Sequence, residues 1–114
     1  MEFRKQKPIY LQIAERLMEQ VLAGGLAEDD RIPSVREVAA QMGVNPNTVM
    51  RTFDYLQGEE IIFNRRGVGY FVASDASGKI LALQRKEFLE EELPAIRQKM
   101  QLLGISLEEL GVRS

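Results

Sequence analysis

Apolar residues recur at helical spacing near the start of the chain. Within residues 8–23 they fall at steps of four, as Ile9, Ile13, Leu17 and Val21. This spacing places them on one side and predicts an amphipathic helix with one buried face. Gly24 and Gly25 end the pattern. The following residues, 26–33, have no such period, and we expect a loop from which Ile32 enters the core.

A second helix is predicted over residues 34–43 by signals at both of its ends. Ser34 precedes Glu37 by three positions, which is the pattern of an N-terminal capping box. Gly43 is a residue that commonly ends a helix. The apolar positions between these ends predict its buried face, as Val35, Val38, Ala39 and Met42.

A third helix is predicted from Pro46 to about Gly58. Proline suits the first helical position, where its missing N–H would have no partner inside the helix, and Asn45 before it is a favoured N-cap. Val49, Phe53 and Leu56 give this helix a buried face. Only about three residues separate it from the second helix, and two short helices joined in this way indicate a helix-turn-helix.

The hydrophobic period changes from helical to β-like in residues 61–73. Two β-rich runs, IIFN and YFVA, flank the sequence RRGVG. Gly67 and Gly69 can adopt the positive φ that a tight turn requires. A β-hairpin is therefore expected, and a hairpin directly after a helix-turn-helix forms a winged helix.

The remaining residues predict a linker followed by a helical tail. The composition of Ser74–Lys79, SDASGK, is typical of a linker. Beyond it, Pro94 predicts a kink or a division into two helices, and residues 106–110 predict a last short helix. The apolar seam of this tail has heptad spacing, with steps of 4, 3, 4 and 3 through Leu89, Leu93, Ile96, Met100 and Leu103.

Composition narrows the classes of function. The 114 residues include no cysteine and no histidine, which removes disulfides, thiolate metal sites and the commonest general base. We therefore expect no enzyme activity, no metal and no cofactor. The apolar runs are short of a membrane span and the N-terminus lacks a signal-peptide pattern, so a cytoplasmic protein is expected. The net charge of −2 counts against nucleic-acid binding, because such domains are often basic.

The sequence IPSVREVAAQMGVNPNTVMRTFDYL, followed by IIFNRRGVGYFV, resembles the winged-helix DNA-binding domain of GntR-type bacterial transcription regulators. The resemblance covers roughly residues 8–73 and includes the opening PIYLQI. The matching positions are Ile32, Pro33, Ser34, Arg36, Val38, Ala39, Gly43, Val44, Thr48, Val49, Gly67, Gly69, Phe71 and Val72. The short tail and the NPNTV stretch are similar to the YtrA-like branch, whose tail of about two helices implies dimerisation.

The chain departs from the family pattern at three positions. Many members have DNA-contacting arginines where Pro46 and Met50 stand, so those contacts are not carried over. Asn45, Asn47 and Thr48 are the nearest replacements. Glu60 stands where the family usually has the glycine that ends the third helix, and Gly58 is expected to end it instead.

The resemblance and the chemistry of the side chains together give a set of candidate DNA contacts. Guanidinium groups suit phosphate and guanine, and asparagine can pair bidentately with adenine. Alternatives stay open: the asparagine before the third helix can be only a cap, and Arg51 can instead pair with Asp54 or contact Tyr55. Arg4, Lys5 and Lys7 are a further basic run. The candidate contacts are Arg36, Asn45, Asn47, Thr48, Arg51, Arg65, Arg66 and Gly67.

The sequence therefore predicts an α+β fold, mostly α, with two parts. Residues 1–75 form a winged helix-turn-helix, and residues 76–114 form a short helical dimerisation tail. The expected function is that of a homodimeric transcription regulator that binds a palindromic operator in double-stranded DNA, and we expect a repressor rather than an activator. Its effector, if any, is unknown. The alternatives are a winged-helix module that binds protein, and a tail that folds back on its own winged helix.

Overall fold

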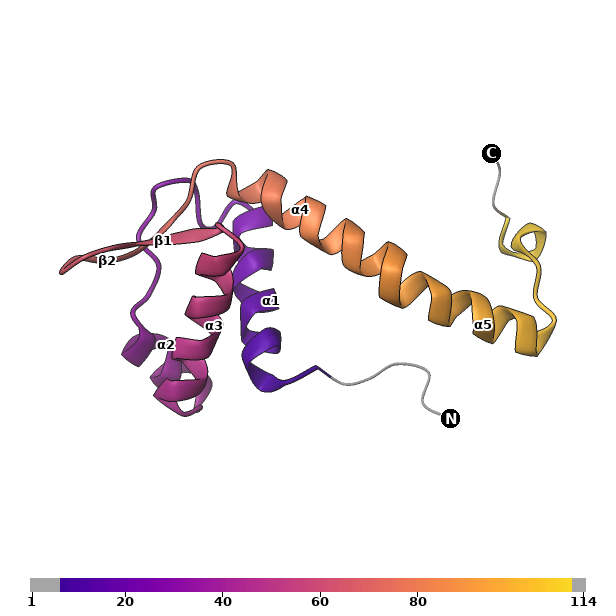
Figure 1. Cartoon of the computed structure of the whole chain (residues 1–114), viewed down its shortest axis with the longest axis horizontal. Helices are drawn as coiled ribbons and strands as arrows, with labels where there is room; N and C mark the ends of the chain where they lie inside the picture. The colour runs from indigo at the N-terminus through magenta and orange to yellow at the C-terminus, as the bar shows by residue number, and fades with distance from the viewer. Residues whose placement is uncertain (1–6, 112–114) are drawn as a thin grey trace. The chain divides into compact units, whose positions relative to one another are not determined.

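The computed structural model describes residues 7–111 and contains mostly helices with one small sheet. Its elements are α1 (Ile9–Leu22), α2 (Val35–Met42), α3 (Pro46–Gly58), β1 (Ile62–Arg65), β2 (Gly69–Val72), α4 (Ala76–Glu87), the π-helical turn η1 (Phe88–Glu92), α5 (Leu93–Leu103) and the 3₁₀ turn η2 (Leu107–Leu110) (Figure 1). This order confirms the predicted fold class, a winged helix-turn-helix followed by a helical tail. The chain forms two compact units, of which one is Lys7–Ala82.

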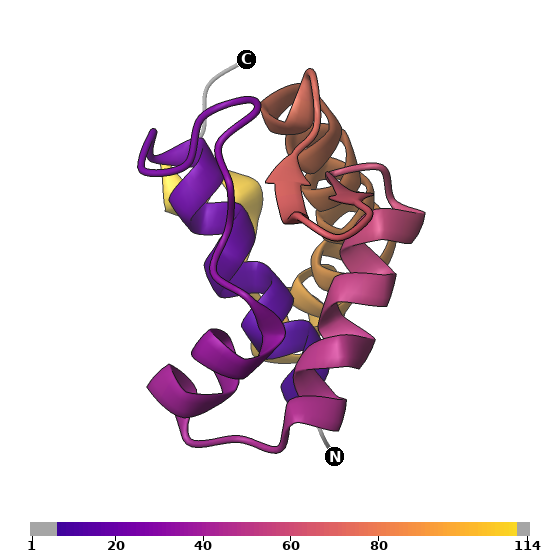
Figure 2. The same cartoon turned by 90° about the vertical axis from the view of Figure 1, so that its left-hand side faces the viewer.

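The first unit is built around the buried face of α3. Val49 and Phe53 are fully buried, and Leu56 is 1% exposed. Helix α3 contacts both α1 and α2, and the turn that joins α2 to α3 closes one end of the domain (Figure 2). The α1 residues that complete this core are Ile13, Ala14, Leu17, Met18 and Val21. The periodicity of the sequence therefore identified these packed faces, but the prediction was wrong for Ile9, which begins α1 at the edge of the core and is 52% exposed.

The hairpin packs on the core through its base and leaves its tip outside the helices (Figure 1). Its strands are antiparallel, with Phe63 opposite Phe71 and Arg65 opposite Gly69. The Phe53 ring of α3 meets the Tyr70 ring edge-on, with centroids 4.8 Å apart. Strand β2 is thereby fixed to the helix that precedes the hairpin.

The loop before α2 joins the sheet rather than only passing over it. Arg31 forms a bridge with Phe71, and the Ile32 N–H donates to the Tyr70 carbonyl at 2.9 Å. Ile32 is 3% exposed, which confirms that it enters the core. The sheet hydrogen bonds of this loop were not predicted, because the segment EDDR has no strand-like alternation.

The prediction of a linker over Ser74–Lys79 was wrong for its last four residues. Helix α4 begins at Ala76, and the Lys79 N–H donates to the Asp75 carbonyl at 3.1 Å. Ala76 and Ile80, one helical turn apart, are 3% and 0% exposed. Their burial orders a segment whose serine and glycine content is typical of loops, and it explains why the compact unit continues to Ala82.

The tail residues 83–111 are mostly helical, and none of them has a buried side chain. The expected interruption near Pro94 is present, because the π-helical turn Phe88–Glu92 precedes α5 and Pro94 lies in the first turn of that helix. Gly104 ends α5 with φ 68°. The predicted last short helix is a 3₁₀ turn, started by a capping box between Ser106 and Glu109.

Candidate nucleic-acid interface

Helix α2 starts and stops through local hydrogen bonds that the sequence predicted. The Glu37 N–H donates to Ser34 Oγ at 3.1 Å, and the Ser34 N–H donates to Glu37 Oε1 at 2.9 Å. The backbone N–H of Ser34, and then its side chain, lower the pKa of the Glu37 carboxyl, with a further contribution from the charge of Arg31. Gly43 ends the helix in the left-handed region, at φ 66°. Arg36 is exposed in the first turn, off the buried face of α2.

The turn into α3 is fixed by Asn45 and Pro46. Asn45 Oδ1 accepts the backbone N–H of Asn47 at 2.8 Å, and Pro46 is the first helical residue. This capping bond engages the oxygen that a bidentate pair with adenine would need. Two residues after Asn45, the side chain of Asn47 is exposed, whereas that of Thr48 is half-buried. The cap reading of Asn45 is thus confirmed, and its contact with DNA stays a prediction.

The exposed side of α3 forms a stripe at helical spacing. Asn47, Met50, Arg51 and Asp54 are all exposed and lie at positions i, i+3, i+4 and i+7. We call these four residues the outward stripe. Three of them are polar or charged, and the stripe begins at the helix N-terminus, where free N–H groups and the helix dipole favour an anion.

Arg51 is held against α1 by an aromatic side chain. Its guanidinium carbon lies 4.2 Å from the centroid of the Tyr10 ring, which meets the Tyr55 ring edge-on. The Thr52 hydroxyl, next along the chain, is fully buried and lies 2.8 Å from the Tyr10 carbonyl and 3.2 Å from that of Thr48. Helices α1 and α3 are therefore joined beside the outward stripe by a hydrogen bond and by the contacts of the Tyr10 ring with Arg51 and Tyr55.

Sequence reasoning missed the roles of Tyr10 and Thr52. The predicted alternatives for Arg51 were Asp54 and Tyr55, its neighbours in sequence, while the observed ring belongs to another helix. For Thr52 a signal was available, because it is a polar residue at a position that falls on the apolar face of α3. Polar residues on such faces need an internal hydrogen bond.

The hairpin carries two arginines at its tip. Arg65 and Arg66 are exposed, and the Arg65 guanidinium carbon lies 4.7 Å from the Phe71 ring centroid and 5.7 Å from that of Phe63. The Val68 N–H donates to the Arg65 carbonyl at 2.9 Å and closes the turn. Gly67, inside this turn, has φ 76°, a conformation that glycine adopts without steric cost.

A third arginine, which sequence reasoning did not select, lies against the hairpin. A Cβ on Gly69 would come within 2.8 Å of Arg31 Nε, and Gly69 has φ 144°. The missing side chain at Gly69 therefore lets Arg31 pack across the strand. Arg31 is exposed, so its charge adds to the positive potential near the hairpin.

The predicted basic run at the N-terminus is described only in part. Arg4 and Lys5 lie outside residues 7–111, while Lys7 forms an ion pair with Glu15 of α1. This pairing reduces the charge that Lys7 can offer to a ligand.

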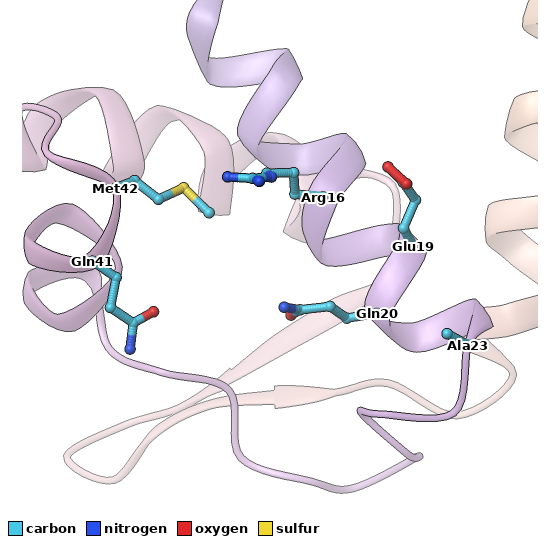
Figure 3. A pocket seen from close by; sticks show the side chains of 6 residues that line it. All are labelled: Arg16, Glu19, Gln20, Ala23, Gln41 and Met42. Atoms are coloured by element: carbon cyan, nitrogen blue, oxygen red, sulfur yellow. The ribbon is translucent and has the colours of Figure 1, made fainter.

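A shallow groove between α1 and α2 is separate from the outward stripe (Figure 3). Side chains of the two helices face one another across it, and neither α3 nor the hairpin contributes to its lining. The lining residues are Arg16, Glu19, Gln20, Ala23, Gln41 and Met42. Within residues 7–111 no three side chains of the metal-binding types gather, and no helix is long and apolar enough to cross a membrane.

Two curated relatives match nearly the whole chain. The HTH-type transcriptional regulator YhcF of Bacillus subtilis, itself uncharacterised, is 38% identical over 109 residues, which cover 96% of this chain and 88% of that protein. The HTH-type transcriptional repressor YtrA of the same organism is 33% identical over 107 residues, or 94% of this chain and 82% of that protein. The second match supports the YtrA-like subfamily.

Solved structures agree with this assignment. A proposed GntR-family transcriptional regulator from Bacteroides thetaiotaomicron superimposes with a TM-score of 0.77 at 47% identity and covers 91% of this chain and 90% of that chain. The DNA-binding domain of AraR, in complex with operator ORX1, superimposes with a TM-score of 0.58 at 28% identity, over 60% of this chain and 82% of that chain. The model of the gntR family of bacterial regulatory proteins matches residues 9–72, and the chain belongs to that family.

Proposed function

We propose that this protein is a transcription repressor that binds operator DNA with α3 in the major groove and the hairpin on the flanking backbone. The observation that carries the proposal is the outward stripe, which begins at a capped helix N-terminus. An α-helix fits the major groove, and the N-terminal residues of a recognition helix commonly contact base edges. Asn47 and Arg51 are exposed in this part of α3.

The ring contacts of the arginines support phosphate binding. Arg51 stacks on Tyr10, and Arg65 stacks on Phe71. An arginine has about 2 kcal/mol of rotamer entropy, and a side chain already held by a ring loses less of it on binding. Arg36 and Arg66 are also exposed and, with Arg31, add positive charge around the stripe and the hairpin.

The relatives support both DNA binding and repression. AraR was solved with operator DNA, and YtrA is named a repressor. The acidic net charge of −2 favours the other function predicted from the sequence, a winged helix that binds protein. Four of the exposed candidate contacts are nevertheless arginines, and a protein-binding hairpin has no need of the pair Arg65–Arg66.

The protein acts as a homodimer held by its tail, and the operator is correspondingly two-fold symmetric. The seam residues Leu89 and Leu103 are 53% and 61% exposed, while Leu93, Ile96 and Met100 are half-buried. A second copy would cover this apolar seam. Two half-sites one helical turn apart would then give the specificity that a single winged helix lacks. A repressor of this kind works in the cytoplasm.

The full chain tests DNA binding by selection of bound duplexes from random DNA. We expect a two-fold symmetric consensus, with Arg36→Ala weakening binding by about 1–3 kcal/mol. Replacing both Arg65 and Arg66 by Ala should flatten the salt dependence, whose slope is about −0.9 per neutralised phosphate in B-DNA. A folded protein that retains no duplex would contradict the proposal and favour the protein-binding module.

The dimer is tested separately in solution. Ile96→Asp introduces a charge into the seam and should give a monomer by light scattering, while Gln98→Asp, an exposed position on another side of α5, should leave the dimer intact. A dimeric Ile96→Asp protein would place the contact elsewhere. Point variants test the dimer better than removal of the tail by truncation after Ser77, because that truncation would also remove the buried Ile80 from the core of the winged helix.

A further inference from the structure

Met50 is the one apolar residue in the outward stripe of α3. Its side chain is 39% exposed, between the polar residues Asn47 and Arg51. Its neighbour on the helix, Arg51, leans onto Tyr10 of α1, with 4.2 Å between the guanidinium carbon and the ring centroid. Of the first three residues of the outward stripe, Asn47 and Met50 are therefore the two that extend outward without such a ring contact.

From this placement we infer that Met50 determines operator specificity by packing against the C5-methyl group of a thymine. The inference rests on the proposed function, in which the outward stripe faces the major groove. It assigns to the site a preference that follows from an apolar side chain rather than from a hydrogen bond.

The chemistry of the major groove leaves few other partners for this side chain. Base edges there present hydrogen-bond donors and acceptors, and thymine adds the apolar methyl group. A thioether sulfur is only a weak acceptor, so Met50 offers little to the polar groups. Opposite them it would displace water without replacing the lost hydrogen bonds, at a cost in affinity. Opposite a thymine methyl it would bury apolar surface on both sides, which is favourable.

Methionine also suits this contact by its shape. The side chain is unbranched and flexible, and it can adapt to the position of a methyl group along the groove. Position 50 lies one turn into α3, within the part of a recognition helix that commonly meets base edges.

Deoxyuridine provides the direct test, because it differs from thymine only by the missing methyl group. The probes are duplexes selected from random DNA by the full-length protein, with each thymine replaced by deoxyuridine, one position at a time in both half-sites. The wild-type protein should lose about fourfold in affinity per half-site at one position, the factor expected for one methyl group. At that position Met50→Ala should bind the thymine and deoxyuridine duplexes equally, and Met50→Leu should regain most of the difference.

Leu22→Ala is the matched control. Leu22 is 37% exposed, close to the value for Met50, but it lies at the end of α1. This variant should keep the wild-type response to deoxyuridine. Wild-type binding with no methyl-sensitive position, or an equal sensitivity in Met50→Ala, would overturn the inference while leaving DNA binding in place. Failure to select any duplex would instead overturn the proposed function and this inference with it.

Discussion

The two asparagines at the start of α3 should separate helix capping from base recognition. Asn45 Oδ1 accepts the Asn47 N–H at 2.8 Å, while the Asn47 side chain is exposed. Loss of an N-cap side chain typically costs about 1 kcal/mol, so Asn45→Ala should lower the melting temperature by roughly 4–8 °C for a domain of this size. Asn45→Ser keeps an oxygen that caps the helix and should preserve stability. Because the capping oxygen is already engaged, Asn45→Ser should also preserve operator affinity.

Asn47 should show the opposite behaviour. A bidentate asparagine–adenine pair contributes about 1–3 kcal/mol of discrimination, so Asn47→Ser should weaken operator binding roughly 5- to 150-fold without loss of stability. Thermal unfolding followed by circular dichroism measures the first quantity, at one protein concentration because dimers melt at concentration-dependent temperatures. Fluorescence anisotropy with a labelled operator measures the second. Asn45→Ser binding as weakly as Asn47→Ser, at unchanged stability, would refute this separation and show that Asn45 contacts DNA as well as capping the helix.

Three further substitutions test the structure around the interface. Thr52→Val should destabilise the protein by about 1–2 kcal/mol in urea unfolding, because it removes the buried hydroxyl 2.8 Å from the Tyr10 carbonyl, whereas Thr52→Ser should keep that bond. Glu60→Gly should stabilise the protein by about 0.5–1 kcal/mol. Glu60 has φ 61°, and a side chain in this left-handed region costs roughly 1–2 kcal/mol, which glycine avoids. The greater freedom of glycine in the unfolded chain cancels part of this gain. The hydrogen bonds that lower the pKa of the Glu37 carboxyl stabilise the folded state at pH values above the unfolded pKa of about 4.3. This contribution to stability is lost as pH falls through the folded pKa. Glu37→Gln should therefore be less stable than wild type at pH 7, and the difference in stability should shrink as pH falls through the folded pKa of Glu37. A difference that stayed constant with pH would contradict the assignment.

Local signals predicted most of the winged helix. The capping box at Ser34, the proline at position 46 and the glycine stop at position 43 act within a few residues, and each is present as predicted. Apolar periodicity identified the buried faces, with the exception of Ile9, because burial follows the helical repeat. The same local method failed for Ala76–Lys79, where two apolar positions bind the segment to the core despite its loop-like composition.

The end of α3 shows how a local prediction can identify the right boundary with the wrong cause. The helix ends at Gly58 as expected, but Glu60 adopts the left-handed conformation for which the family uses glycine. Lys79 Nζ donates to the Glu60 carbonyl at 3.2 Å, a contact between residues far apart in sequence. The family position of the glycine was thus a better guide to the backbone than the nearest glycine in this chain.

Candidate site residues divide along the same line. Exposure of Arg36, Asn47 and the hairpin arginines followed from their places off the apolar faces. The contacts of Arg51 with the Tyr10 ring and of Arg65 with the Phe71 ring could not be predicted from the sequence. They depend on how α1 packs on α3 and on the register of the hairpin. The sequence thus predicts which side chains are exposed to a ligand. It does not predict which of them are held in one orientation by contacts with other elements.

The location of the basic side chains explains how a chain of net charge −2 can still bind DNA. Electrostatic attraction to a phosphate depends on the charges within about a Debye length, about 8 Å at physiological ionic strength, rather than on the total charge of the protein. Arg51, Arg65 and Arg66 belong to the two elements proposed to meet the duplex. Residues 79–114, by contrast, include six basic and six acidic residues and add no net charge. If these arginines supply the phosphate contacts, each protomer makes few of them, and the proposed dimer would gain its specificity from base contacts in two half-sites. A repressor with this charge distribution would depend on its dimer contact as strongly as on its recognition helix.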